Sequence, residues 1–544
     1  MANTVENLEI HDSGRVHIGN IFHNRTEDRC LLELRSTDPR HDKARLEETK
    51  GGLLELYRWM FDEPAFKRWK TDEASRLLWI KGDPGKGKTM LICGIIDELR
   101  TATKLVDPSA DTLLSFFYCQ ATDSRINSAV AVVRGLLYLL SVQHLPIVAY
   151  IREKYDHAGG QLFKDANAWI AVTEILTTVL EDPGLPMTYL VIDALDECLQ
   201  DLPKLLAYIV KTSALPRVKW IVSSRNIRDI EMKLRLGPEE RLDLELRDTA
   251  EQVSQAVRKY IEHCVSELPG VQDDPALREQ VEEVMLRKAS GTFLWVSLVA
   301  KELQDVMPWD ILDTLQEMPT DLQDIYGRMM ENIQRMKPKY RPLCLVVLAT
   351  VVGTYRPLHL EELASIAGLP DSISATTKFV ADIATSCGSF LTLRDDSVYI
   401  IHQSAEDFLE ERFEAIFMRE RRSVQHDLFT RSLVTLSGTL RRNIYKATPY
   451  AQFIDIVRLR PSPDPLDPVR YACTYWVDHL GDSEQTTEED SQLVYDFLRQ
   501  HFLHWLEALG ILGSILAGIS SMRKLGIVLK VCTWPQHASY VDHH

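Results

Sequence analysis

One short stretch of this chain, LLWIKGDPGKGKTM at residues 77–90, restricts the possible folds more than any other feature. It places the pattern Gly-x-x-x-x-Gly-Lys-Thr directly after an apolar run and directly before the helix-compatible segment MLICGIIDELR. Glycine lets the backbone N–H groups of such a loop turn inward around phosphate oxygens, and the positive end of the following helix attracts the same anion. The sequence therefore predicts a strand, a phosphate-binding loop and a helix in an α/β domain.

Each residue of this loop has an expected part in a nucleotide site. Lys88 is expected to reach the β- and γ-phosphates, and the Thr89 hydroxyl is expected to coordinate Mg²⁺. The remaining residues are expected to surround the phosphates: Gly82, Asp83, Pro84, Gly85, Lys86 and Gly87. The predicted cofactors are ATP or GTP, together with Mg²⁺.

A second motif, MTYLVIDALDECLQDL at residues 187–202, supplies acidic groups. Asp193 ends a predicted buried strand, where its carboxylate is expected to face the nucleotide metal. Asp196 or Glu197 is expected to orient the attacking water, and the sequence does not decide between the two. The alternative for both is a solvated acidic turn or an N-cap of the next helix.

A third motif, VKWIVSSRN at residues 218–226, ends a strand in Ser224 and Arg225. An arginine at the tip of a strand beside the phosphate loop is expected to sense the γ-phosphate. The alternative is an ordinary surface arginine. Asp196, Glu197 and Arg225 are thus the predicted catalytic residues, and Thr89 and Asp193 are the predicted metal ligands.

Four apolar runs separated by helix-compatible segments indicate a parallel sheet with helices on both faces. They are LLWI (77–80), LLSFFYC (113–119), TYLVID (188–193) and VKWIVSS (218–224). Beyond residue 246 the apolar spacing becomes helical, and SFLTLRDDSVYIIHQ predicts one hairpin with its turn at Asp395 and Asp396. The predicted fold class is an α/β P-loop NTPase domain followed by helical-bundle, winged-helix and C-terminal helical domains.

The predicted boundaries follow the changes in pattern. A charge-dense stretch, RTEDRCLLELRSTDPRHDKARLEETK, suggests a linker with one short helix, and the apolar run Ala508–Ile519 suggests a single core helix. The predicted parts are a strand-like segment (1–24), a linker and leading helix (25–75), the NTPase core (76–235), a helical domain (236–320), a winged-helix-like domain (321–415) and a C-terminal helical region (416–544).

Bulk composition excludes several classes of protein. The 544 residues carry a formal net charge of −17, which disfavours nucleic acid and anionic membrane surfaces as main partners. The 9 cysteines are scattered singly, as expected of reduced thiols in a cytoplasmic protein. The most apolar run, residues 508–519, is shorter than a membrane span, and no signal peptide opens the chain.

The motifs GDPGKGKT, VIDALDE and SSRN together resemble the NACHT class of signal-transducing STAND NTPases. Further segments resemble the nephrocystin-type region of fungal heterokaryon-incompatibility and cell-death receptors: FFYCQATDSRINSAVAVVRGLLYLL, GTFLWVSLVAKEL, MPTDLQDIYGRMM, YRPLHLEELA and IIHQSAEDFLEE. The resemblance implies a nucleotide-controlled switch that self-oligomerises on activation and hydrolyses nucleotide slowly.

The same resemblance implies further details. A winged-helix histidine, here His402, would contact the bound diphosphate, although a core or helix-capping histidine is an equal alternative. Relatives often carry a Gly-x-Pro signature near the base, whereas SGTFLW has no proline, so ATP and GTP both remain open. Relatives usually continue into ankyrin or WD-type sensor repeats, which this sequence is expected to lack.

The opening segment, NTVENLEIHDSGRVHIGNIFHN at residues 3–24, resembles a HET-s-type amyloid signalling motif. Its apolar positions suit the interior of one β-solenoid rung, which cannot bury that face alone but is favoured to stack when several copies meet. The implied partner is a HET-s-type pore-forming cell-death effector. The alternatives are a flexible tail or an edge strand. Two other functions remain open for the whole chain: a P-loop enzyme acting by turnover, and a repeat-less decoy or regulator.

Overall fold

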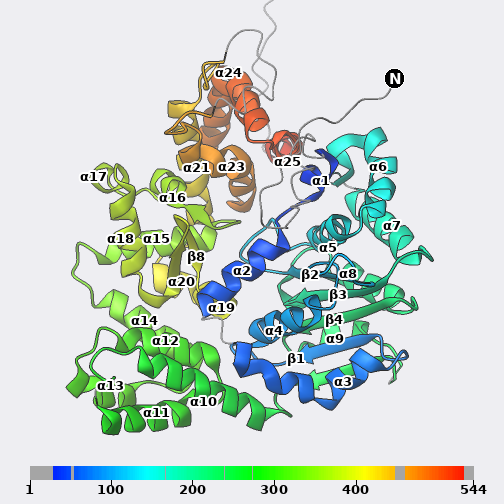
Figure 1. Ribbon diagram of the computed structural model, residues 1–544. Coiled ribbons are helices and arrows are strands. Elements are labelled where there is room, and N and C mark those ends of the chain that lie inside the picture. Colours follow the sequence, from blue (N-terminus) through cyan, green and yellow to red (C-terminus); the bar gives the residue numbers. More distant parts are fainter. Residues whose placement is uncertain are drawn as a thin grey trace, which may run out of the picture.

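The structure is a computed structural model that describes residues 29–50, 54–163, 165, 167–237, 239–272, 274–447, 460–484 and 486–531. The predicted amyloid motif at residues 3–24 lies outside the described residues. A parallel sheet with its helices stands on one side of the molecule, and mostly helical segments, together with the small sheet that contains β8 (Ser397–Ile400), stack along the other (Figure 1).

The central sheet has five strands in the order β2-β3-β4-β1-β5, and every neighbouring pair is parallel. This confirms the predicted parallel sheet, and four of its strands coincide with the four apolar runs. Strand β5 was not predicted, because RLDLE alternates polar and apolar residues at the edge of the sheet and lies beyond the predicted boundary at residue 235. The strands are β1 (Leu77–Lys81), β2 (Thr112–Tyr118), β3 (Met187–Asp193), β4 (Val218–Ser224) and β5 (Arg241–Glu245).

Helices cover both faces of this sheet, because alternate residues along each buried strand point to opposite sides. On β1, Leu78 and Ile80 join one apolar core, whereas Leu77 and Trp79 join another. Helices α3 (Pro64–Thr71) and α4 (Lys88–Arg100), with the 3₁₀ helix Leu54–Asp62, pack on the first face. The second face carries α5 (Ala129–Gln143), α6 (Pro146–Ala158), α7 (Ala168–Glu181), α8 (Leu202–Ser213) and α9 (Arg228–Lys233).

The charge-dense stretch before the sheet is folded. Instead of a linker with one short helix it forms α1 (Arg29–Leu34) and α2 (Pro39–Lys50). Lys43 of α2 is buried and pairs with Asp97 of α4 at 2.9 Å, and Arg134 of α5 donates to the carbonyl of Leu34 at 2.9 Å. Helix α2 lies in the middle of the molecule, between the sheet and the strand β8 (Figure 1). Buried ion pairs, rather than an apolar stripe, hold it there, which explains why its sequence resembled a linker.

Two further units continue the first core away from the sheet. The helical unit, residues 250–334, contains α10 (Ala250–Ser266), α11 (Pro275–Ala289), α12 (Phe293–Leu303), α13 (Ile311–Glu317) and α14 (Leu322–Gln334). The hairpin unit, residues 341–417, contains α15 (Arg341–Gly353), β6 (Leu358–His359), α16 (Leu360–Ile366), α17 (Asp371–Ser374), α18 (Thr377–Ser386), β7 (Leu391–Arg394), β8 (Ser397–Ile400), α19 (Gln403–Glu411) and α20 (Phe413–Phe417).

The predicted hairpin is confirmed. Strands β7 and β8 pair antiparallel, with Arg394 opposite Ser397, and β6 extends the sheet in the order β6-β8-β7. The turn residues Asp395 and Asp396 have φ of +44° and +56°, a left-handed conformation that aspartate tolerates better than most residues. The hairpin leads directly into α19.

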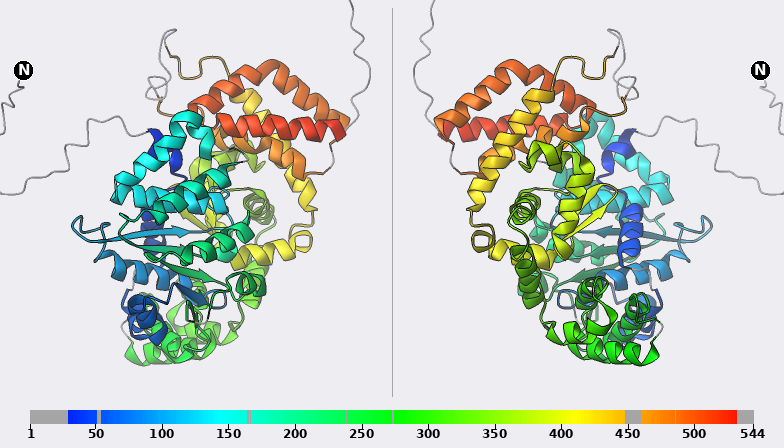
Figure 2. Two further views of the ribbon diagram at one scale, coloured as in Figure 1. Left: turned by 90° about the vertical axis from the view of Figure 1, so that its right-hand side faces the viewer. Right: turned by 90° about the vertical axis from the view of Figure 1, so that its left-hand side faces the viewer.

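The C-terminal helices form a separate apolar core. They are α21 (Arg421–Thr439), α23 (Arg470–Asp482), α24 (Glu488–Ile511) and α25 (Ile515–Val531). The apolar run Ala508–Ile519 is not one helix, because Gly513 adopts a φ of +66° and separates α24 from α25. These helices and the helical unit lie at opposite ends of the molecule (Figure 2).

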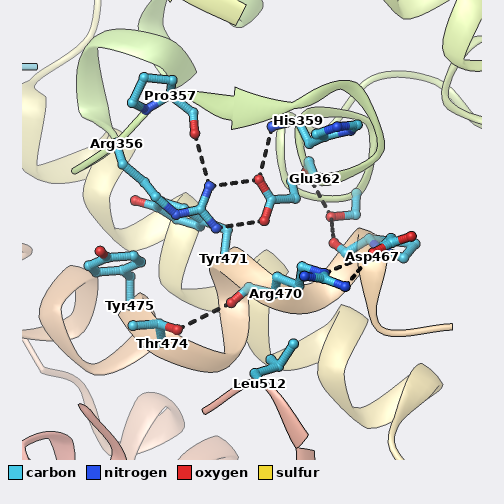
Figure 3. A network of polar contacts seen from close by, with 12 residues as sticks. Arg356, Pro357, His359, Glu362, Asp467, Arg470, Tyr471, Thr474, Tyr475 and Leu512 are labelled. Atoms are coloured by element: carbon cyan, nitrogen blue, oxygen red, sulfur yellow. Dashed lines mark hydrogen bonds and ion pairs between the residues drawn. The ribbon is translucent and has the colours of Figure 1, made fainter. Parts of the chain in front are cut away.

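A polar network joins the hairpin unit to the C-terminal helices (Figure 3). The guanidinium of Arg356 donates to both carboxylate oxygens of Glu362, at 2.8 and 2.6 Å, and lies 5.1 Å from the centre of the Tyr471 ring on α23. The carbonyl of Tyr355 accepts a bond from the N–H of Ser124 in the NTPase core, and the N–H of Tyr355 donates to the Tyr471 hydroxyl oxygen. The carboxylate of Glu362 is almost fully buried, so its loss of contact with water is offset by the two bonds from Arg356.

Candidate nucleotide-binding site

A cavity of about 350 Å³ opens beside the phosphate loop, at the carboxyl ends of the parallel strands. Ligands of α/β proteins bind at this edge of the sheet. The cavity has walls from the loop, from the end of β3, from the helical unit and from the hairpin unit. The predicted residues that line it are Pro84, Gly85, Gly87, Lys88, Thr89, Asp193, Asp196, Glu197, Arg225 and His402.

Contacts with the helical unit fix the shape of the loop. Gly85 and Gly87 have φ of +73° and +85°, and a Cβ on Gly85 would stand 2.9 Å from side-chain atoms of Thr292 and Leu294. The carbonyl of Gly85 accepts bonds from the N–H groups of Phe293 and Leu294, at 2.9 and 3.4 Å. Only glycine combines this backbone with this close approach, so the cradle fits a phosphate chain held by backbone groups.

Lys88 is placed as a phosphate-binding lysine would be. Its Nζ donates to the carbonyls of Gly82 and Asp83, at 2.7 and 2.9 Å, so the ammonium lies across the loop. Burial lowers the pKa of Lys88, with the carboxylates of Asp196 and Asp193 opposing that effect. An anion in the cavity would offset the same loss of hydration, so the residues present fit a nucleotide phosphate.

Three loop residues do not line the cavity. A Cβ on Gly82 would meet the Leu246 side chain at 3.1 Å, so this glycine serves close packing. Asp83 accepts two bonds from the guanidinium of Arg247, at 3.0 and 2.7 Å. Lys86 donates to the carbonyl of Ser290 at 2.6 Å. The side chains of Asp83 and Lys86 therefore tie the loop to its surroundings, which the motif pattern did not predict.

Thr89 and Asp193 lie where the metal ligands were expected, and both also line a second cavity of about 120 Å³. The Ser223 hydroxyl donates a short hydrogen bond to the carboxylate of Asp193. The oxygen of the same hydroxyl accepts a bond from the Ala194 N–H at 2.9 Å. Within the described ranges no group of three or more His, Cys, Asp or Glu side chains is placed to hold a metal ion. One hydroxyl and one carboxylate suit Mg²⁺, which takes most of its ligands from phosphates and water.

Asp196 is engaged by Arg225. Its carboxylate accepts from the backbone N–H of Arg225 at 3.0 Å and from Nε at 2.9 Å. The Nη1 atom of the same guanidinium donates to Asp407 of α19, also at 2.9 Å. Strand β4 lies between β1 and β3, so Arg225 reaches the cavity between the phosphate loop and the acidic turn. The arginine is therefore held between the NTPase core and the hairpin unit.

Glu197 has a different environment. Its Oε2 accepts from the backbone N–H of Ala121 at 3.2 Å, and the residue lines both cavities. Burial, helped by the neighbouring charge of Asp196, raises the pKa of Glu197 to about 8. The environments of the two carboxylates thus differ: Asp196 pairs with an arginine, whereas burial brings the pKa of Glu197 towards neutral pH.

His402 lines both cavities and also caps a helix. Its Nδ1 accepts from the N–H of Ser404 at 3.0 Å at the start of α19, and the Ser404 hydroxyl bonds to the Tyr326 hydroxyl at 2.9 Å. Both readings of this histidine are thus compatible with its position.

Several cavity residues were not predicted from the sequence. At one end Tyr57, Tyr260 and Phe293 form an aromatic wall, with ring centres 5.7 to 5.9 Å apart, and Lys301 stands nearby. From the hairpin unit come Thr392, Arg394 and Ile401. These residues belong to four separate parts of the chain, and no local pattern connects them. The segment SGTFLW, in which relatives often have a proline near the base, was the one sequence signal for the aromatic wall, because it contains Phe293.

In the part of the chain that the structure describes, we find no helix with the length and apolar character needed to cross a membrane.

Comparison with known proteins adds a family and a relative. The family described as Nephrocystin 3, N-terminal, matches residues 55–225, which contain the phosphate loop, Asp193, both acidic residues and Arg225. The chain is 45% identical over 529 residues to the vegetative incompatibility protein HET-E-1 of Podospora anserina. That alignment covers 92% of this chain and 38% of the relative, so the chain spans well under half of the relative's length.

Solved structures give weaker likenesses. A Walker-type ATPase of Pyrococcus abyssi aligns with a TM-score of 0.32 and 12% identity, over 64% of this chain and 95% of that one. The ORC2 protein of Aeropyrum pernix aligns with a TM-score of 0.28 and 10% identity, over 68% and 94%. The family match and the relative show that the chain has a P-loop region similar to the nephrocystin 3 N-terminal family and resembles a vegetative incompatibility protein over most of its own length.

Proposed function

We propose that this chain is a nucleotide-controlled signalling switch of the STAND type. The observation that carries the proposal is the bridge made by Arg225, which binds Asp196 beside the phosphate loop and Asp407 on the hairpin unit. A ligand that binds the guanidinium of Arg225 weakens its ion pair with Asp407 and so changes the free energy of the contact between the NTPase core and the hairpin unit. A ligand shifts a conformational equilibrium only through such differential contacts.

In this proposal ATP or GTP occupies the larger cavity with Mg²⁺. Lys88 and the loop N–H groups bind the phosphates, and Thr89 and Asp193 hold the metal. Asp196 positions Arg225, and Glu197 is the better candidate for the general base, because its carboxylate is not engaged by a cation. The aromatic residues Tyr57, Tyr260 and Phe293 offer a surface on which a base stacks. Mg²⁺ would neutralise developing phosphate charge.

The hairpin unit is interpreted as the winged-helix-like domain of the switch, with His402 and Arg225 favouring the closed form when a diphosphate is bound. Sensing of a ligand would open the molecule, and exchange for a triphosphate would allow self-oligomerisation. Residues 3–24 would then template a β-solenoid in a cell-death effector. The name of the relative, a vegetative incompatibility protein, supports a role of this kind.

The switch is tested by measuring mass in solution with diphosphate and with a non-hydrolysable triphosphate. We expect a monomer with the first and an oligomer with the second, together with hydrolysis slower than one turnover per minute. Rapid hydrolysis by a stable monomer would support an enzyme acting by turnover. Failure to bind nucleotide despite an intact loop would support a decoy or regulator.

The amyloid output is tested separately with a peptide of residues 1–24. We expect cross-β fibrils that bind thioflavin T and seed a candidate effector's aggregation-prone tail. An Ile18→Pro peptide is the matched control, since proline removes a ladder hydrogen bond and should prevent fibrils. A wild-type peptide that stays unstructured at high concentration would refute the motif and leave the nucleotide switch intact.

A further inference from the structure

Arg394 reaches the nucleotide cavity from the hairpin unit, although no motif includes it. It is the last residue of β7, directly before the turn at Asp395, and it lines both the larger and the smaller cavity. Its side chain is half-buried. The hairpin therefore brings a fixed cation to the wall that the two cavities share.

Among the residues that the structure describes, this guanidinium has no carboxylate partner and no hydrogen-bond acceptor. The guanidinium lies over the ring of Tyr399, with the guanidinium carbon 5.5 Å from the ring centre. Burial, and then the like charge of Arg45, lower the pKa of Arg394. A half-buried arginine without an acceptor is costly, because its five donors favour a bidentate anion.

The residues around Arg394 indicate which end of a nucleotide it faces. The smaller cavity is lined by Thr89, Asp193 and Glu197, the expected metal ligands and the candidate base. The aromatic residues Tyr57, Tyr260 and Phe293 line the larger of these two cavities and not the smaller one. A nucleotide with its base against those rings and its phosphates on the loop would direct its terminal phosphoryl group towards the shared wall.

We propose that Arg394 binds the terminal phosphoryl group of a nucleoside triphosphate, as a contact made by the hairpin unit within the same chain. The inference rests on the proposed nucleotide site and adds a residue that distinguishes a triphosphate from a diphosphate. Arg394 belongs to the hairpin unit, and Arg225 pairs with Asp407 of the same unit. A third phosphate therefore gains a contact with Arg394 and competes with Asp407 for Arg225.

Tyr399 and Arg45 act as positioning residues for Arg394. The ring of Tyr399 on β8 also lies 5.6 Å from the guanidinium carbon of Arg45, on α2. One ring thus packs against two cations, which come from β7 and from α2. The contact restricts the rotamers of Arg394 and aims it at the shared wall.

The test compares nucleotide affinities of the full-length protein and the Arg394→Gln variant, by calorimetry with ADP, ATP analogues, GDP and GTP analogues. Arg412→Gln is the matched control, because Arg412 also lies over an aromatic ring, that of Phe408 at 4.5 Å, but lines neither cavity. We expect Arg394→Gln to weaken the triphosphate analogues about tenfold or more and the diphosphates less than twofold, and Arg412→Gln to change neither.

Equal losses for both nucleotide classes would overturn the assignment to the terminal phosphate, and unchanged affinities would overturn the contact altogether. If the wild-type protein bound no nucleotide, the proposed function itself would fail, which is a separate outcome. A melting curve without nucleotide distinguishes a structural role: we expect Arg394→Gln to melt no lower than wild type, and a clear drop would contradict the proposal. Tyr399→Leu should reproduce part of the loss in affinity for triphosphate analogues. Tyr399→Phe, which keeps the ring, should bind them as tightly as wild type.

Discussion

Arg225, at the carboxyl end of β4, donates through Nη1 to Asp407 of α19 at 2.9 Å. The two residues are far apart in sequence and belong to different parts of the fold, the parallel sheet and the hairpin unit. Both side chains are about one-third exposed, so water screens this pair only in part. The same guanidinium also holds Asp196, which makes the pair the direct link between the acidic turn and the hairpin unit.

Replacing Asp407 should loosen this link. Asp407→Asn keeps the shape of the side chain but removes the charge that pairs with Arg225, at a cost of about 1–2 kcal/mol. We expect a bound fluorescent diphosphate to dissociate about five- to 30-fold faster, as measured by stopped-flow chase. Glu410→Gln is the control, because Glu410 lies on the same helix and pairs with Arg421 instead. Equal rates for both variants would show that the link does not restrain the nucleotide.

Replacing Lys88 should remove nucleotide binding. Lys88→Ala deletes the ammonium that lies across the loop carbonyls, and the lost charge-assisted bonds are worth about 3 kcal/mol, or about 100-fold in affinity. Lys86→Ala removes a neighbouring ammonium whose side chain bonds to Ser290 outside the cavity, so its affinity should stay near wild type. Calorimetric titration compares the two. Similar losses of nucleotide affinity in both variants would contradict the specific role of Lys88 in binding the phosphates.

Glu197 should make stability fall as pH rises. The pKa of its carboxyl is raised to about 8 in the folded state from 4.5, so between these values the folded chain holds a proton that the unfolded chain has released. Stability therefore falls through this window, by at most about 1.4 kcal/mol per pH unit. Glu197→Gln should flatten the dependence and exceed wild type most at pH 8.

Melting temperatures from pH 5 to 8, without nucleotide, measure this effect. Glu331→Gln on α14 is the control, since Glu331 is exposed and pairs with Arg335. Its profile should run parallel to that of wild type. A Glu197→Gln profile that also runs parallel would refute the raised pKa.

Arg356 should stabilise the junction with the C-terminal helices without affecting the nucleotide. Lysine cannot make the two parallel bonds to Glu362 or the same stacking on Tyr471, and Glu362 is buried. We expect Arg356→Lys to lower the free energy of unfolding by about 2–3 kcal/mol, measured by urea titration. Arg422→Lys, in an exposed pair with Glu484, should cost less than about 0.5 kcal/mol. Loss of nucleotide affinity in Arg356→Lys would show that the junction reaches the cavity.

The sequence predicted those parts of the fold that depend on local pattern. Buried strands without alternation marked β1 to β4, and the Asp395–Asp396 turn marked the hairpin. The edge strand β5 escaped because one face meets solvent, and α2 escaped because ion pairs such as Lys43–Asp97 hold it. Gly513 divides an apolar run that looked like one helix, since periodicity does not report a left-handed φ.

The candidate site divides in the same way. Motif spacing predicted roles for Lys88, Thr89 and Asp193, because a P-loop needs such residues at fixed positions, and all three line the larger cavity. The different environments of Asp196 and Glu197 depend on Arg225 and Ala121, which the fold brings from other segments. Arg394 and Tyr57 belong to no recognisable sequence motif. They line the cavity only because the fold places β7 and the 3₁₀ helix Leu54–Asp62 beside it.

The two bonds from Phe293 and Leu294 to the carbonyl of Gly85 have a consequence for biosynthesis. The first N–H groups of a helix have no partner within it, so the phosphate loop serves as the missing cap of α12. Because the loop is made some 200 residues earlier, an emerging chain already carries the cap when α12 leaves the ribosome. Translation thus delivers the template before the helix that docks on it.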